Sequence, residues 1–153
     1  MIEQNYNEEG IFEILSNTDI DSLNEEEAKE FCKLIEEKNK AIINQFSFMV
    51  SNTQNKNVAK GIVPYVDSDD IGIRNLAGEI LINMGENAVQ ALTDELTNGD
   101  KHKKKFIIDV LGLIGDPRPV DKIIQVMKTD DDENVILACI EALGNIKSEK
   151  SVA

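Results

Sequence analysis

The chain has 153 residues, of which 41% are hydrophobic, so it is long enough to form one compact domain with a continuous apolar core. Acidic residues outnumber basic residues by 29 to 16, and the resulting formal charge of −13 disfavours binding to nucleic acid and to anionic lipid surfaces. No apolar run reaches the roughly 18 residues of a membrane span, and the N-terminus opens with Glu3, Glu8 and Glu9 instead of a basic leader, so we expect a soluble, cytoplasmic protein.

The N-terminal segment, residues 1–54, is predicted to be an acidic helical cap. Residues 1–38 contain twelve acidic residues and three lysines, a net charge of −9. A short helix is expected around Glu9–Leu15. Apolar residues at helical spacing, with no proline or glycine between them, predict one long, at most slightly broken, helix over about 24–51. A polar, charged segment of this kind is typical of the end of a stack of helical repeats.

Residues 55–153 repeat with a period of about 31 residues. Three segments align without gaps: 73–85, 103–115 and 135–147. Between them, anchor valines are spaced by 31, 31 and 32 residues: Val58, Val89, Val120 and Val152. Each repeat is predicted to contain two helices, because its apolar residues recur at intervals of three and four. The predicted fold class is therefore all-α, a right-handed α-solenoid of antiparallel helix pairs.

Polar residues and glycines mark the expected ends of these helices. An aspartate follows each of the first three valines by eleven positions, at a place where a helix N-cap is expected: Asp69, Asp100 and Asp131. Gly85 and Gly115 are predicted to be left-handed C-caps. Gly112 and Gly144 lie inside helices, where each costs about 1 kcal/mol relative to alanine, so we expect close helix packing to compensate.

The last repeat is predicted to be incomplete. The helix expected over 135–146 is apolar on nearly every side, and Ser148–Val152 is expected to begin a turn and a further helix. We therefore expect the native protein to continue with more repeats. The exposed helix 135–146 is predicted to self-associate.

These features resemble the short HEAT-like repeats first described in phycobilisome lyases, over roughly residues 56–153. The resemblance depends on a core of the type A-x-x-x-L-G-x-I-G and on the sequence GDPRPV at Gly115–Val120. An arginine expected early in each first helix is present as Arg74, replaced by Lys104 and lost at Ile136, so a ladder of arginine–aspartate pairs is incomplete. Tetratricopeptide and ankyrin repeats have similar periods, but their sequence signatures are missing.

We find no set of residues that predicts catalysis, a cofactor or a metal site. The single histidine, His102, is expected to be a solvated residue at a helix start. Cys32 and Cys139 lie within apolar helical patterns and are expected to be reduced and buried. The acidic clusters Asp67–Asp70 and Asp130–Glu133 lack the ligand spacing of a calcium loop, so helix capping is the better interpretation. Lys101–Lys105 is interpreted as a solvated helix start in preference to a nucleic-acid patch.

We therefore expect an intracellular scaffold or adaptor that binds a protein or peptide and has no catalysis of its own. The alternative is an accessory subunit or fragment of a lyase-type enzyme built on the same repeats. In HEAT-type stacks the second helices commonly line the concave face, which predicts a polar binding surface from Lys60, Gln90, Asp94, Glu95, Asp121, Lys122 and Gln125. Among the aromatic residues, Phe31, Phe46 and Phe106 are expected in the core, and Phe48 is predicted to be an exposed contact residue.

Overall fold

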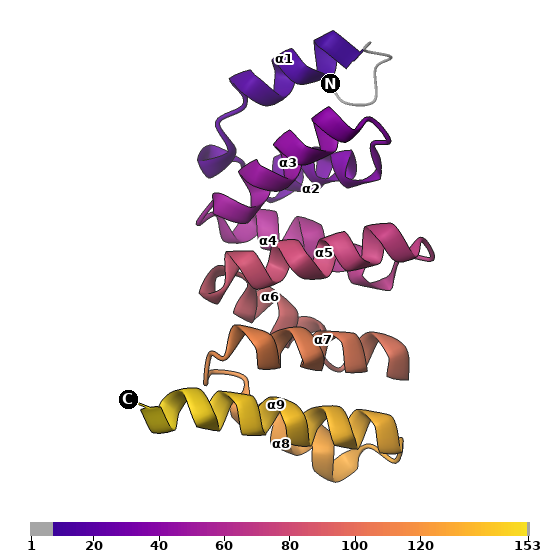
Figure 1. Ribbon diagram of the computed structural model, residues 1–153, viewed down its shortest axis with the longest axis vertical. Coiled ribbons are helices and arrows are strands. Elements are labelled where there is room, and N and C mark those ends of the chain that lie inside the picture. Colours follow the sequence, from indigo (N-terminus) through magenta and orange to yellow (C-terminus); the bar gives the residue numbers. More distant parts are fainter. Residues whose placement is uncertain (1–7, 153) are drawn as a thin grey trace. The chain divides into compact units, whose positions relative to one another are not determined.

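The computed structural model describes residues 8–152, with side chains described as far as Ile146 (Figure 1). The chain forms two compact units, one ending at Met84 and the other beginning at Gly85. Throughout the described range the regular secondary structure is helical. The predicted all-α fold is confirmed.

The first unit contains five α-helices and three short 3₁₀ helices within its described residues. In chain order they are α1 (Glu8–Asn17), η1 (Ile20–Ser22), α2 (Glu25–Cys32), η2 (Lys33–Glu36), α3 (Lys40–Asn52), α4 (Lys56–Ile62), η3 (Val63–Asp67) and α5 (Ile71–Met84). α2 packs against α4, α3 packs against α5, and α1 packs against α3. Helix α5 also packs against η3 and α4, which precede it in the chain.

The single long helix predicted over 24–51 is wrong, because the chain reverses between α2 and α3. The side chain of Asn39 accepts hydrogen bonds from the backbone N–H groups of Ala41 and Ile42 and so begins a new helix. The reversal allows the rings of Phe31 and Phe46 to pack with their centroids 5.6 Å apart. On one straight helix these residues would be separated by about 22 Å, at 1.5 Å per residue.

The second unit contains α6 (Glu86–Glu95), α7 (Lys101–Ile114), α8 (Val120–Thr129) and α9 (Glu133–Val152). α6 packs against α7, α8 packs against α9, and α7 packs extensively against α9 (Figure 1). Consecutive helices therefore form pairs across the turns that carry the acidic clusters. This arrangement confirms the prediction of helix pairs.

Aspartate side chains cap three of the repeat helices, as the acidic clusters predicted. The carboxylate of Asp100 accepts a hydrogen bond from the backbone of Lys103 at 3.0 Å. At the other two turns the capping residue lies one position later than predicted, because Asp70 caps α5 and Asp132 caps α9. Each cap satisfies backbone N–H groups that have no partner within the helix.

The two glycines predicted as C-caps adopt different conformations. Gly115 is left-handed, with φ +78° and ψ +7°, and its N–H donates to the carbonyl oxygen of Leu111, so this prediction is confirmed. Gly85 also has a positive φ, +59°, but its ψ of −126° lies outside the left-handed helical region. It is the N-cap of α6 instead of a left-handed C-cap, so that prediction is wrong.

The turn predicted at Ser148 is also wrong, since α9 continues as far as Val152. The sequence contains the reason. Lys147 occupies the position that corresponds to Gly115, and neither glycine nor proline follows it in α9. Without a residue suited to a left-handed cap, the helix has no local signal to stop. Helix α9 packs against both α7 and α8.

Candidate partner-binding site

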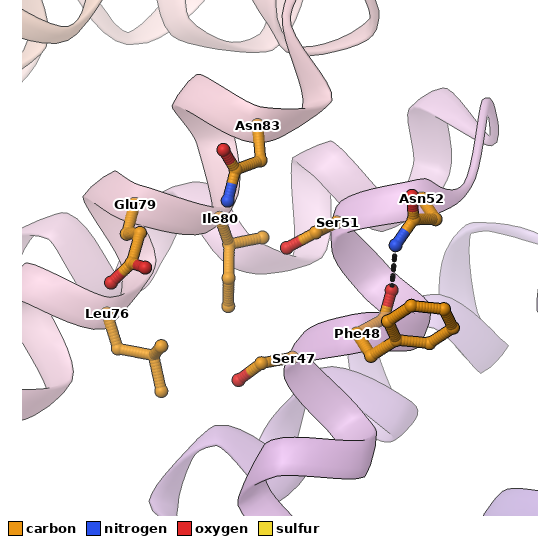
Figure 2. A pocket seen from close by; sticks show the side chains of 8 residues that line it. All are labelled: Ser47, Phe48, Ser51, Asn52, Leu76, Glu79, Ile80 and Asn83. Atoms are coloured by element: carbon orange, nitrogen blue, oxygen red, sulfur yellow. Dashed lines mark hydrogen bonds between the residues drawn. The ribbon is translucent and has the colours of Figure 1, made fainter.

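A shallow groove lies between α3 and α5 of the first unit (Figure 2). Helix α3 contributes Ser47, Phe48, Ser51 and Asn52 to it, and α5 contributes Leu76, Glu79, Ile80 and Asn83. Figure 2 shows Ser47 and Ser51 turned toward Leu76 and Ile80. The groove combines apolar surface from α5 with a polar border from both helices.

Helical periodicity explains why these residues meet. Phe46 and Val50 point into the core of the unit, so the residues that follow each of them, Ser47 and Ser51, lie at the border of the buried face. Ile80 is buried and Leu76 is half-buried, one helical turn apart on α5. Small serine side chains on α3 therefore leave space above the apolar residues of α5.

The volume of the groove limits what it can hold. It encloses about 250 Å³, which is smaller than the roughly 300–1,000 Å³ typical of pockets for small molecules. One or two side chains of a bound polypeptide would fill this space. Glu79 is the one charged residue among those that line it, and its carboxylate gives the groove a preference for a cationic neighbour.

Phe48 lies at the outer edge of this groove. Its side chain is 67% exposed, and its ring lies on the side of α3 away from Leu76 and Ile80 (Figure 2). The backbone beneath it is held in the helix, where its carbonyl oxygen accepts a hydrogen bond from the Asn52 side chain at 2.7 Å. The predictions that Phe48 is exposed and that Phe31 and Phe46 are buried are confirmed, while Phe106 is half-buried.

The polar surface predicted on the second helices is divided between the two units. Lys60 lies on α4 of the first unit, where it is exposed and its ammonium group is 4.0 Å from the carboxylate of Glu25. The other predicted residues lie in the second unit, on α6 (Gln90, Asp94 and Glu95) and on α8 (Asp121, Lys122 and Gln125).

Two of these residues already hold neighbouring helices together. The ammonium group of Lys122 donates to the carbonyl oxygen of Thr93 at 2.9 Å, which links α8 to α6. Glu95 accepts a hydrogen bond from the side chain of Lys103 at 3.1 Å, which links α6 to α7. The exposed members of the set that face solvent are Gln90, Asp94, Asp121 and Gln125. Whether they contact a partner stays a prediction.

The lysines of Lys101–Lys105 form ion pairs within the second unit. Four carboxylates lie within 4 Å of them, in the pairs Lys101–Asp132, Lys103–Glu95, Lys104–Asp130 and Lys105–Asp109. The pair between Lys104 and Asp130, at 2.5 Å, also lowers the pKa of the Asp130 carboxyl. A patch whose charges are neutralised locally contributes little to phosphate binding. His102 is exposed near the start of α7, as predicted.

Both cysteines are free and buried, as predicted. Burial raises the pKa of the Cys32 thiol to about 12, and burial together with the nearby Asp130 carboxylate raises that of Cys139 to about 11. Thiols of this kind are poor nucleophiles at neutral pH. Among the described residues, no three His, Cys, Asp or Glu side chains are grouped so as to hold a metal ion.

The sequence did not predict the groove itself. Its residues are separated by a stretch of chain that includes α4 and η3, and they come together only because α3 packs against α5. The one available signal was Phe48, an aromatic residue outside the apolar stripe of its helix.

Comparison with known families shows which kind of repeat this is. Residues 89–153 match the family described as HEAT repeats. This part of the chain consists of HEAT repeats. The match covers α7, α8 and α9 and most of α6, and the helix pairing of the second unit agrees with it.

The other comparisons are more distant. A crystal structure of an engineered protein, a Northeast Structural Genomics Consortium target, is similar to this chain with a TM-score of 0.42 and 19% sequence identity, over 92% of this chain and 67% of the other. No curated protein sequence matches the chain. In the described part of the chain, no helix combines the length and apolar character needed to cross a membrane.

Proposed function

We propose that this protein is an intracellular scaffold or adaptor, without catalysis of its own, that binds a segment of another protein at the α3–α5 groove. The observation that carries the proposal is the exposure of Phe48, 67%, at the edge of a groove with apolar residues inside it. Aromatic residues, phenylalanine included, are enriched at protein interfaces, where a few side chains contribute most of the binding free energy. A cytoplasmic location is supported by the two free, buried cysteines.

The groove specifies the chemistry of the segment. An apolar side chain would lie over Leu76 and Ile80, and a basic side chain next to it would pair with Glu79. The serines of α3 and the amides of Asn52 and Asn83 offer hydrogen-bonding groups along the border. A peptide with an apolar residue followed closely by a lysine or arginine matches this pattern.

The test is capture of partners from an extract of the source cells, quantified by mass spectrometry for the full chain and its variants. Phe48→Ala and Ser51→Trp, which fills the groove, are each expected to lower capture of the principal partner at least about tenfold, equivalent to about 1.4 kcal/mol. Leu113→Ala is the matched control, since Leu113 is also an exposed apolar residue but lies on α7.

A second arm tests the polar surface of α6 and α8. Asp94→Lys combined with Asp121→Lys leaves the contacts of Lys122 and Glu95 in place, so thermal stability should change little. If this variant lost capture of the partner while Phe48→Ala kept it, the binding site would be assigned to α6 and α8 instead of the α3–α5 groove. A coloured protein or a stoichiometric bound metal would instead support the accessory subunit of a lyase-type enzyme.

A further inference from the structure

The packing of α9 on α7 shows how one helix of this protein receives another. Ile108 of α7 is completely buried. One turn later, Gly112 allows very close approach, since a Cβ atom placed there would be 2.9 Å from the Cα atom of Ala142 on α9. Ile108 and Gly112 therefore form a face of α7 that accepts the backbone of the neighbouring helix.

Helix α9 carries the same pair of residues at the equivalent repeat positions. Ile140 corresponds to Ile108 and Gly144 corresponds to Gly112. Ile140 is 52% exposed, however, and a Cβ atom at Gly144 would have no neighbouring atom within 4 Å. With Ile136, which is half-buried one turn before Ile140, these residues form a continuous apolar strip that we call the α9 outer face. Within the described part of the chain Ile136 is partly covered, whereas Ile140 and Gly144 are open.

The α9 outer face is complementary to itself. Ile136 and Gly144 lie four residues on either side of Ile140, and one is bulky where the other has no side chain. If two copies of α9 pack antiparallel about a twofold axis at Ile140, each Ile136 lies over Gly144 of the second copy. We infer that the α9 outer face is a self-association surface, and that its occupant is α9 of a second copy of this chain in this register.

Other features of the repeat favour a second copy over another helix pair of the same type. On α7, the residue one turn before Ile108 is Lys104, which pairs with Asp130 at the turn before α9. On α9 the equivalent residue is Ile136. If a further helix pair resembling α8–α9 packed on α9, the carboxylate equivalent to Asp130 would therefore lie against the apolar side chain of Ile136. A second copy of α9 would instead place the open space above its Gly144 against Ile136.

Charge and size set the expected strength of the association. Residues 85–153 contain thirteen acidic and nine basic residues, so most of the chain's negative charge lies elsewhere. Glu141 is adjacent to Ile140, and the twofold axis places it near Glu141 of the second copy. Raising the salt concentration from about 0.05 M to about 0.5 M should therefore strengthen association. One helix face buries less than the roughly 1,200 Å² of a stable interface, so we expect a weak, reversible dimer.

Sedimentation equilibrium of the full chain tests the inference. The wild type is expected to change from monomer to dimer between about 1 μM and about 1 mM. Gly144→Leu fits in the open space of the monomer but meets Ile136 of the second copy, so it should weaken dimerisation at least about tenfold. Combining it with Ile136→Ala exchanges the large and small residues and should restore association to within about threefold of wild type.

Generic adhesion of apolar surface predicts the opposite order. Gly144→Leu adds exposed apolar area, so stronger association of this variant would overturn the proposed register. A wild-type chain that stays monomeric up to about 1 mM would overturn the inference as a whole. Leu113→Ala, outside the α9 outer face, should dimerise like the wild type. Circular dichroism and thermal unfolding at low concentration verify that each variant folds, and none of these readouts depends on the α3–α5 groove.

Discussion

At the scale of single residues, two glycines at the same repeat position have different roles. Sequence reasoning expected close packing to compensate for both, and this is confirmed for Gly112, which contacts Ala142. At Gly144 it is wrong, because the space beside that residue is open within the described structure. The repeat alignment predicts the same surroundings for both glycines. Their actual contacts depend on whether another helix lies beside each of them.

The two alanine variants should therefore change stability in opposite directions. Gly112→Ala places a carbon against the backbone of α9, and we expect it to lower the free energy of unfolding by about 1–3 kcal/mol. Gly144→Ala meets no neighbour and gains helix propensity, so it should raise the free energy of unfolding by up to about 1 kcal/mol. Urea unfolding at a concentration where the chain is monomeric measures both; equal effects would contradict the α7–α9 packing.

At the scale of secondary-structure elements, the acidic clusters set where helices begin. Their role as caps was predicted from the sequence, because aspartates recur eleven positions after the anchor valines. The exact residue was not predicted at two of three turns, since neighbouring aspartates offer equivalent chemistry. Backbone geometry selects among them: at the last turn the carboxylate of Asp132 lies within 3.1 Å of the N–H groups of Asn134 and Val135.

Alanine substitutions at that turn distinguish the capping residue from its neighbour. Asp132→Ala leaves two backbone N–H groups at the start of α9 without this acceptor, so we expect a loss of about 1 kcal/mol of stability. Asp131→Ala is the matched control, being exposed and next in sequence, and should change stability by less than about 0.5 kcal/mol. Thermal unfolding gives both values. A larger loss of stability in Asp131→Ala than in Asp132→Ala would show that the N-cap is Asp131, the residue predicted from the repeat period.

At the scale of the whole molecule, the chain divides into two units that each contain one buried cysteine. Cys32 lies in α2 of the first unit and Cys139 lies in α9 of the second. The pKa of each folded thiol is raised, to about 12 and about 11 respectively, mainly by burial. In the unfolded chain a thiol has a pKa near 8.5. Each thiol therefore reports on the unit that contains it.

We expect stability to fall as the pH rises above about 8.5, because the unfolded thiols ionise while the folded thiols remain neutral. The contribution of the buried, neutral thiols to the free energy of unfolding is fully present below about pH 8.5. It is progressively lost as the pH rises toward the raised pKa values of the folded thiols. Urea unfolding at pH 7.5, 8.5 and 9.5 measures the trend, and Cys32→Ala combined with Cys139→Ala should flatten it. Under native conditions both thiols should react slowly with a disulfide reagent; immediate labelling of either would show that its unit is open.

The candidate site was predictable only in part, for a reason that Phe48 illustrates. Phe48 lies outside the apolar stripe of its own helix and so points away from the core that this stripe faces, which allowed its exposure to be predicted from the sequence. The groove next to it needs α3 to lie against α5, and the sequence interpretation had joined α2 and α3 in one helix. Periodicity alone does not reveal that error, because one long helix and two antiparallel helices joined by a short turn have the same spacing of apolar residues.

The sequence by itself determined the helical class, the period and the role of the acidic clusters as helix caps, because each depends on spacing or composition within a few tens of residues. Tertiary structure decided the break before α3, the groove beside Phe48, the pairing of the lysines and the difference between Gly112 and Gly144. These features depend on which helices are neighbours. Local propensity specifies the helices, but packing between residues distant in sequence selects the surfaces that they bury and those that they leave available.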